Sequence, residues 1–228
     1  MTPRPDKSRC AEAVLFDMDG LLVDTEPLWT VAEIELAHEL GGEWDLEIKA
    51  EIVGTRLDVA VPRVLRHYGH EDTPQAIAKA SAFLLDRMVQ LFDADLPLHD
   101  GALGLIDAVR ARGVPTALVS SSFRVLVDAA LHGLGEHRFD FTLAGDEVRH
   151  GKPDPEPYLV ACERLAVKPD RCVVLEDAMS GVRSAEAAGC TVVAVPFVTA
   201  IPPDPPRRHV VTSLPHIDTD WLLALPCS

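Results

Sequence analysis

Apolar and polar positions divide the second half of the chain into alternating helices and strands. Apolar residues recur every three or four positions in some stretches, which is typical of helices, and form short unbroken runs in others, which is typical of buried strands. This alternation indicates parallel strands joined by right-handed crossovers. The predicted helices are 102–112, 123–134, 156–165 and 182–188; the predicted strands are 115–120, 141–144, 172–176 and 191–195, with 210–211 as one more candidate.

The first half of the chain has a different pattern. Ala13–Phe16 is a short apolar run that predicts a buried strand, but residues 25–93 show only helical spacing, with Gly41-Gly42 and Gly69 as helix ends. Turn-forming residues fill 93–101. We therefore expect an α/β fold, a doubly wound parallel-sheet core built from residues 1–24 and 94–228, with an all-helical cap inserted at 25–93.

Composition limits the possible partners. The 228 residues are 47% hydrophobic, which suits one large or two small domains, and the net charge of −15 makes nucleic acid an unfavourable partner. No apolar run reaches the ~18 residues of a membrane span, and residues 1–10 resemble a frayed tail more than a signal peptide. The five cysteines are scattered without a Cys-x-x-Cys pair, so we expect a reducing, cytoplasmic location.

Two acids follow the first predicted strand. Asp17 and Asp19 stand two positions apart, so strand alternation would direct both side chains to one side, at the sheet edge where open α/β folds place ligands. Paired acids at such an edge serve metal binding, nucleophilic attack or acid–base work. The alternative is a strand that ends in a polar Asp-Gly turn.

Two further segments carry chemistry that suits an anion. Ser120, Ser121 and Ser122 follow a strand and precede a helix, where hydroxyl and backbone N–H groups can bind an anion or simply cap the helix at Phe123. Lys152 lies in Gly-Lys-Pro-Asp-Pro-Glu-Pro, whose prolines stiffen the backbone enough to aim one ammonium group into a site. The alternative for Lys152 is an exposed loop lysine.

A second pair of acids ends another strand. Glu176 and Asp177 follow Val173–Leu175 and could converge with Asp17 and Asp19 across the sheet edge. Three or four carboxylate oxygens make a hard-cation site that suits Mg²⁺. A surface Glu-Asp dipeptide is the alternative interpretation.

Together these segments resemble the haloacid dehalogenase (HAD) superfamily. All four motifs of that family occur in order, as Asp17-Met-Asp19-Gly, Ser120, Lys152 and Glu176-Asp177, and the match covers nearly the whole chain. The family resemblance implies a Rossmann-like core with a small helical cap. The runs Asp-Thr-Glu-Pro-Leu-Trp, Gly-Lys-Pro-Asp-Pro and Leu-Glu-Asp-Ala-Met-Ser-Gly resemble its sugar-phosphatase and β-phosphoglucomutase branch.

The resemblance implies a Mg²⁺-dependent phosphatase that acts on a small phosphorylated metabolite, such as a sugar phosphate. Asp17 would attack phosphorus and form an aspartyl-phosphate, and Asp19 would act as the general acid and base. Ser120, Ser121 and Lys152 would bind the phosphoryl group. Mg²⁺ would be held by the Asp17 carboxylate, the Asp19 carbonyl and Asp177, with Glu176 in or near the shell.

Other activities, within the family and beyond it, remain to be weighed against a phosphatase. Asp19 disfavours dehalogenation and phosphonate hydrolysis, because the branches with those activities lack the second acid. A mutase like β-phosphoglucomutase stays an alternative, although Trp29 stands where that branch carries a cap histidine. Arg56 and Arg87 resemble cap cations that contact the substrate, but either could be a solvated or ion-paired helix residue. A non-catalytic binding protein on the same scaffold is the remaining alternative.

Overall fold

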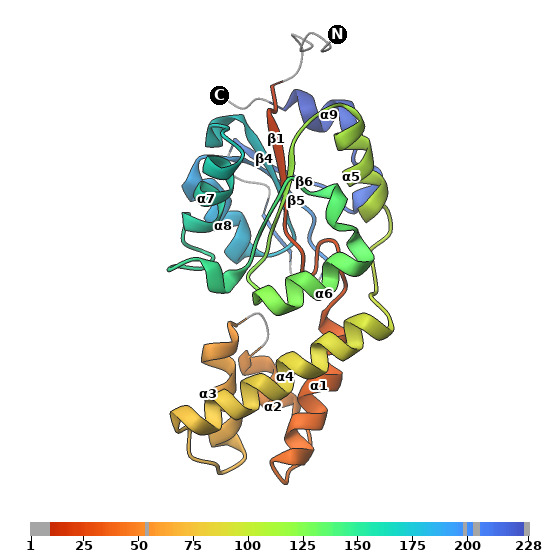
Figure 1. Cartoon of the computed structure of the whole chain (residues 1–228). Coiled ribbons are helices and arrows are strands. Elements are labelled where there is room, and N and C mark those ends of the chain that lie inside the picture. Colours follow the sequence, from red (N-terminus) through yellow and green to blue (C-terminus); the bar gives the residue numbers. More distant parts are fainter. Residues whose placement is uncertain (1–9, 53–54, 198–199, 203–205, 226–228) are drawn as a thin grey trace.

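A parallel sheet flanked by helices carries a separate helical unit below it (Figure 1). The computed structural model describes residues 10–52, 55–197, 200–202 and 206–225. Most of the predicted N-terminal tail and Cys227 lie outside these ranges. Among the described residues, no helix is both long and apolar enough to span a membrane.

The sheet places the first strand in its centre. Its order is β3-β2-β1-β4-β5-β6, and every neighbouring pair is parallel. The inner strands β1, β2, β4 and β5 are buried along their whole length, which explains why each is an apolar run without polar alternation. The strands are β1 (Ala13–Phe16), β2 (Thr116–Val119), β3 (Phe141–Leu143), β4 (Cys172–Glu176), β5 (Thr191–Ala194) and β6 (Arg208–Val210).

Helices cover both faces of the sheet. α5 (Ala102–Ala111), α6 (Arg124–Leu134) and α9 (Thr219–Ala224) share one hydrophobic cluster with the side chains of one face, and α7 (Glu156–Arg164) and α8 (Met179–Ala188) share a second cluster with the other. This is the doubly wound arrangement that alternating helices and strands predict. Short 3₁₀ helices occur at Glu136–Arg138, Gly145–Glu147, Pro169–Arg171 and Leu214–His216.

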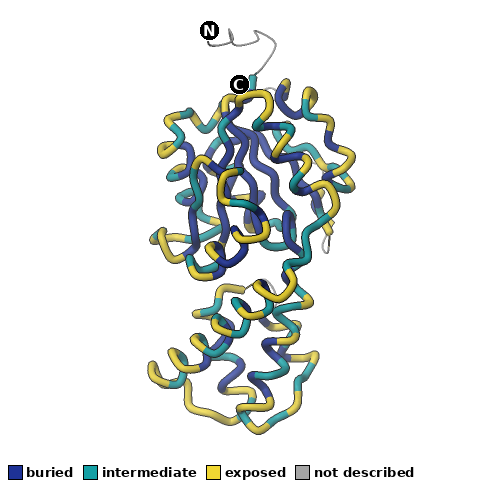
Figure 2. Tube along the Cα trace, turned by 45° about the vertical axis from the view of Figure 1, so that its right-hand side comes forward, coloured by how far each residue is buried: buried dark blue, intermediate teal, exposed yellow. Residues whose placement is uncertain are grey.

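The cap consists of α1 (Glu26–Glu39), α2 (Leu46–Ile52), α3 (Leu57–His67) and α4 (Pro74–Ala94). α4 begins after Thr73, whose side chain accepts a hydrogen bond from the Ala76 N–H, and it packs against α1, α3 and the core helix α6. Buried positions follow the strands and the inward faces of the cap helices (Figure 2). The two connections to the core lie side by side, because the Asp24 N–H donates to the Pro97 carbonyl at 2.8 Å and the His99 N–H to the Leu22 carbonyl at 2.9 Å.

The predicted fold class, a doubly wound α/β core with an inserted helical cap, is confirmed. Local details differ. The helix ends at Gly41-Gly42 and Gly69 divide 25–93 into three predicted helices, which leaves out the short α2, in which Leu46, Ile48 and Ile52 alternate with charged residues. The apolar pattern also misses α9. β6 covers Arg208–Val210 rather than 210–211, because pairing with β5 at the sheet edge defines this polar strand.

Candidate active site

The carboxyl ends of three neighbouring strands bring the predicted site residues together. Asp17 follows β1, Ser120 follows β2, and Glu176 ends β4 with Asp177 directly after it. The registers Phe16↔Leu118 and Phe16↔Leu175 place these positions at the same level of the sheet. The polar positions after the three strands therefore share one edge, as the sequence predicts.

Lys152 joins all three of these strand ends. Its ammonium donates to Asp17 Oδ1 at 2.5 Å, to Glu176 Oε1 at 2.6 Å and to the Val119 carbonyl at 2.8 Å. These acceptors use all three of its N–H donors. The side chain is only 4% exposed, so the interpretation of Lys152 as an exposed loop lysine is wrong.

Two residues that the sequence analysis did not identify as part of the site hold Glu176 in place. The Tyr158 hydroxyl, from α7, donates to Glu176 Oε1 at 2.6 Å. Gly181 faces the same carboxylate so closely that an added Cβ would lie 1.7 Å from Oε1. The only signal for Gly181 in the sequence is its place at the predicted start of a helix, and Tyr158 has the sequence appearance of an ordinary core aromatic.

The carboxylates outnumber the ammonium group. One oxygen each of Asp17, Glu176 and Asp177 lies within 4.8 Å of the others. Burial, with the Glu176 charge, raises the pKa of Asp17 well above its ordinary value and the pKa of Asp177 to about 8. Burial acts to lower the pKa of Lys152, but Asp17 and Glu176 outweigh it and raise that pKa. The site therefore has more carboxylate groups than one ammonium group can compensate.

The donor set fits a hard divalent cation. Oxygen-only ligands that include several carboxylates are those that Mg²⁺ prefers. Gly20, with φ of +82°, leaves room beside Asp177, because a Cβ at that position would lie 2.2 Å from Asp177 Oδ2. The residues at this edge are thus compatible with a magnesium ion, and a side chain at position 20 would collide with one of its candidate ligands.

The serine segment, residues 120–122, turns toward Asp19 and leaves α6 without a serine cap. Ser120 Oγ donates to Asp19 Oδ2 at 2.8 Å and accepts the Ser122 N–H at 2.8 Å. The N-cap of α6 is Phe123, without a side-chain hydrogen bond, and the Arg124 N–H instead donates to Asp146 Oδ1 at 2.8 Å. The interpretation of these serines as helix caps is therefore wrong. Within the described ranges, the Ser121 N–H has no acceptor.

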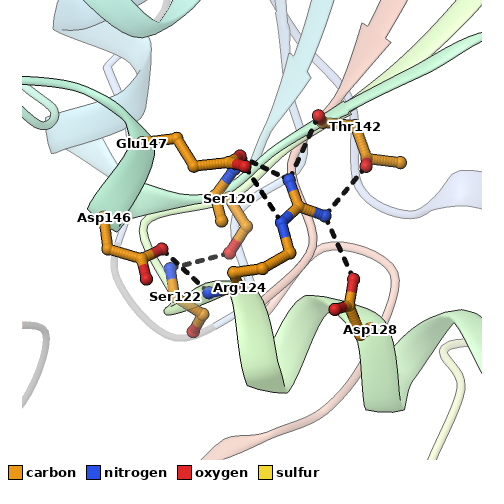
Figure 3. Close-up of polar contacts among 8 residues, drawn as sticks. Ser120, Ser122, Arg124, Asp128, Thr142, Asp146 and Glu147 are labelled. Atoms are coloured by element: carbon orange, nitrogen blue, oxygen red, sulfur yellow. Dashed lines mark hydrogen bonds and ion pairs between the residues drawn. The ribbon is translucent and has the colours of Figure 1, made fainter.

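Arg124 connects the end of the serine segment to β3 and to the loop after it (Figure 3). Its guanidinium pairs with Glu147 and donates to the Thr142 hydroxyl at 3.0 Å. The Gly145 N–H donates to the Ser122 carbonyl at 2.8 Å, and a Cβ on Gly145 would lie 2.1 Å from the Ser121 carbonyl oxygen. The two loops therefore interlock, and this fixes the direction in which the Ser120 side chain and the Ser121 N–H point.

A cavity of about 580 Å³ lies over these groups and extends into the cap. Its lining includes Asp17, Asp19, Ser121, Lys152, Glu176 and Asp177 from the core. From the cap it includes Trp29, Trp44, Lys49 and Arg56, among others. Arg56 precedes α3, has a side chain 40% exposed, and lies beside the core loop, since a Cβ on Gly151 would be 2.6 Å from its Nη1.

The structure does not place Arg87 in this cavity. Its guanidinium donates to both carboxylate oxygens of Glu35, at 2.7 and 2.8 Å, across the α1–α4 contact. It is not among the residues that line the cavity. The geometry thus gives no support to the predicted substrate contact, because α4 directs this side chain toward α1. The helical pattern alone could not show which face of α4 meets the site.

The model of haloacid dehalogenase-like hydrolases matches residues 11–189. The chain belongs to this family. This hydrolase is 34% identical to the phosphorylated carbohydrates phosphatase of Thermotoga maritima over 78% of its own length and 82% of the relative's. It is 32% identical to the Escherichia coli fructose-1-phosphate phosphatase YqaB over 80% and 95%. The predicted membership of the HAD superfamily is thus confirmed.

Two solved structures have the same fold as this chain. Protein CbbY of Rhodobacter sphaeroides, in complex with phosphate, superposes with a TM-score of 0.81 at 30% identity, covering 90% of this hydrolase and 96% of that chain. The β-phosphoglucomutase of Clostridium difficile superposes with a TM-score of 0.76 and covers 92% and 95%, but at 23% identity it supports the fold alone.

We expect Gly181→Ala to disturb the hydrolase at both the fold and the site. The new Cβ must displace the Glu176 carboxylate or shift α8, which should lower the free energy of unfolding by about 1–3 kcal/mol and reduce activity. Gly104→Ala in α5 is the control, because nothing lies within 4 Å of its added Cβ. Denaturant unfolding of both variants measures the difference, and equal stability would contradict the geometry.

Arg87→Gln should leave catalysis unchanged. The ion pair with Glu35 is partly exposed, so its loss should cost about 1 kcal/mol of stability or less. Steady-state kinetics on any accepted phosphomonoester, alongside thermal unfolding, provides the measurement. An increase in KM of tenfold or more would show that Arg87 reaches the substrate after all.

Proposed function

We propose that this hydrolase is a Mg²⁺-dependent phosphatase that cleaves small phosphomonoester metabolites, with sugar phosphates as the substrate class. The observation that carries the proposal is the convergence of Asp17, Lys152, Glu176 and Asp177 at one sheet edge beneath a cavity of about 580 Å³. The names of the relatives, which include phosphatases of phosphorylated carbohydrates and of fructose 1-phosphate, support the substrate class.

Asp17 is the proposed nucleophile. Lys152 holds one of its carboxylate oxygens, Oδ1, at 2.5 Å, so the side chain has a defined orientation while the other oxygen is left for attack on phosphorus. The attack would form an aspartyl-phosphate and release the alcohol, and water would then hydrolyse the acyl phosphate. The lysine also offsets negative charge as two anions approach each other, which is the main electrostatic obstacle to this reaction.

Asp19 is the proposed general acid and base. Its Oδ2 accepts the Ser120 hydroxyl, whereas its Oδ1 is buried without a hydrogen-bond partner in the described part of the chain. A carboxyl group oriented by one oxygen, with the other available, suits proton transfer to the leaving alcohol and later from the attacking water. Desolvation raises the pKa of Asp19, which favours its protonated form before the alcohol leaves.

The remaining groups would bind the phosphoryl oxygens and the metal. The Ser121 N–H is free to donate to a phosphoryl oxygen, whereas Ser120 and Lys152 would each turn a donor from its present acceptor toward the phosphoryl group. The Asp17 carboxylate, the Asp19 carbonyl and Asp177 would hold Mg²⁺, which when bound supplies positive charge to offset the carboxylates of Asp17, Glu176 and Asp177. Glu176 lies within reach of the same ion, but its Oε1 already accepts from Lys152 and Tyr158, so we assign it mainly to positioning the lysine.

Hydrolysis is favoured over phosphoryl transfer between sugar positions. Trp29 lines the cavity at the position where the mutase branch carries a cap histidine. The intact set of acids and the lysine also argues against a protein that only binds its ligand. Release of inorganic phosphate from a panel of phosphorylated metabolites, compared with conversion of glucose 1-phosphate to glucose 6-phosphate in the presence of glucose 1,6-bisphosphate, separates the two enzyme activities.

Asp17→Asn should lower the rate of phosphate release about a thousandfold or more, because an amide is a far weaker nucleophile than a carboxylate. Asp107→Asn is the matched control, since Asp107 is a half-exposed acid on α5 that pairs with Arg138 and does not line the cavity. Undiminished hydrolysis by Asp17→Asn would refute the assignment, and a retained thermal transition in the variant excludes unfolding as the cause of any loss.

EDTA should abolish phosphate release, and Mg²⁺ should restore it. Mg²⁺ should also raise the unfolding temperature, because an ion that binds only the native state stabilises it. Asp177→Asn should lose most of that rise in unfolding temperature, while Asp107→Asn keeps it. Full activity in EDTA, or an equal Mg²⁺-dependent rise in both variants, would contradict the proposed metal site.

A further inference from the structure

A charged cluster occupies the cap end of the cavity. Lys49, on α2, lies 2.7 Å from Glu26 Oε1 and 2.7 Å from Glu33 Oε2, both on α1. All three residues line the cavity, and none belongs to the four motifs at the sheet edge. We call Glu26, Glu33 and Lys49 the cap cluster.

The cap cluster carries a net negative charge. Lys49 and Glu33 have side chains only 16% and 11% exposed, so the surrounding protein screens their interaction less than water would. Burial acts to lower the pKa of Lys49, but Glu26 and Glu33 raise it, and the ammonium stays charged. One ammonium against two carboxylates leaves a formal charge of about −1. Lys49 is thus already neutralised and poorly placed to bind an anion.

Two tryptophans line the cavity together with this cluster. Trp29 and Trp44 line the same cavity, and the Trp44 indole nitrogen is buried without an acceptor among the described residues. Carboxylates accept hydrogen bonds, whereas an ammonium or indole N–H donates them. A hydroxyl group can satisfy both kinds of partner, but a second phosphate or carboxylate would face like charge.

Arg56 is the other cation on the cap side of the lining. It lies at the rim, beside Gly151 of the core loop, and pairs with Asp58 at 3.2 Å. A second anion could be accepted only there, at the boundary between cap and core. The cap end itself, where the part of the substrate farthest from the phosphate would lie, has no cation without a carboxylate partner in the described lining.

We propose that the cap cluster selects monophosphates whose far end is uncharged and rich in hydroxyl groups, and rejects bisphosphates. Glu26 and Glu33 accept substrate hydroxyl protons, and Lys49 fixes the two carboxylates relative to each other. The inference rests on the proposed phosphatase function and narrows its substrate class. It also makes Glu33 a specificity-determining residue.

Two matched substrate pairs test the inference. Fructose 1-phosphate is compared with fructose 1,6-bisphosphate, and glucose 6-phosphate with glucose 1,6-bisphosphate, by kcat/KM for phosphate release. We expect the native hydrolase to prefer a monophosphate by tenfold or more. Glu33→Gln should reduce that preference about tenfold, because it removes one of the two carboxylate charges that repel a second phosphate and leaves Lys49 paired with Glu26 alone.

A second variant separates charge from damage to the fold. Lys49→Gln leaves both carboxylates without their cation, so the preference for monophosphates should rise, opposite to the change in Glu33→Gln. General disruption of the cap would shift both variants in the same direction. Glu35→Gln is the matched control, because Glu35 is also on α1 but pairs with Arg87 outside the cavity lining; its ratio should match that of the native protein.

The outcomes are distinct. A native enzyme that cleaves the bisphosphates as well as the monophosphates overturns the inference. Equal changes in the monophosphate-to-bisphosphate ratio of kcat/KM in Glu33→Gln and Lys49→Gln also overturn it. So does a ratio in Glu33→Gln that equals the ratio in Glu35→Gln. In each case p-nitrophenyl phosphate hydrolysis shows that the proposed function holds. Absence of phosphate release from p-nitrophenyl phosphate and from the sugars would overturn the proposed function, and this inference with it.

Discussion

The ammonium group of Lys152 is the interaction on which the arrangement of the site depends. It lies between carboxylates at the ends of two different strands, and it also donates to the carbonyl at the end of a third. Removing a charge from water is costly unless partners compensate it. Each group in this contact therefore requires the others, which couples the loop before α7 to the ends of β1, β2 and β4.

The supporting residues follow from the same requirement. Tyr158 and Gly181 fix Glu176, and Arg124 with Gly145 fixes the serine segment. None of them needs to touch a substrate. They limit the freedom of the groups that do, and a site held in this way needs little reorganisation when charge develops during a reaction.

The sequence predicts the site residues at the sheet edge well, because each is marked by a pattern within a few positions of the chain. An apolar run followed by an acid or serine is visible in the chain, and parallel strands bring all such positions to one edge. The cap is less predictable. Whether Arg87 faces the cavity or Glu35 depends on how α4 rotates against α1, and the charge balance around Lys49 depends on contacts between α1 and α2. Helical spacing identifies a buried stripe but not the partner of each charged residue.

The central position of β1 has a consequence for how the molecule forms. Leu15 pairs with Ala117 on one side and with Val174 on the other, so β1 is synthesised long before either of its two neighbours in the sheet. Contacts this distant in the chain slow folding, because a long loop must close before they form. Until β4 is synthesised, one edge of an apolar strand stays unpaired, the kind of surface that promotes aggregation. The contacts among the cap helices lie within residues 26–94, so they do not wait for β4.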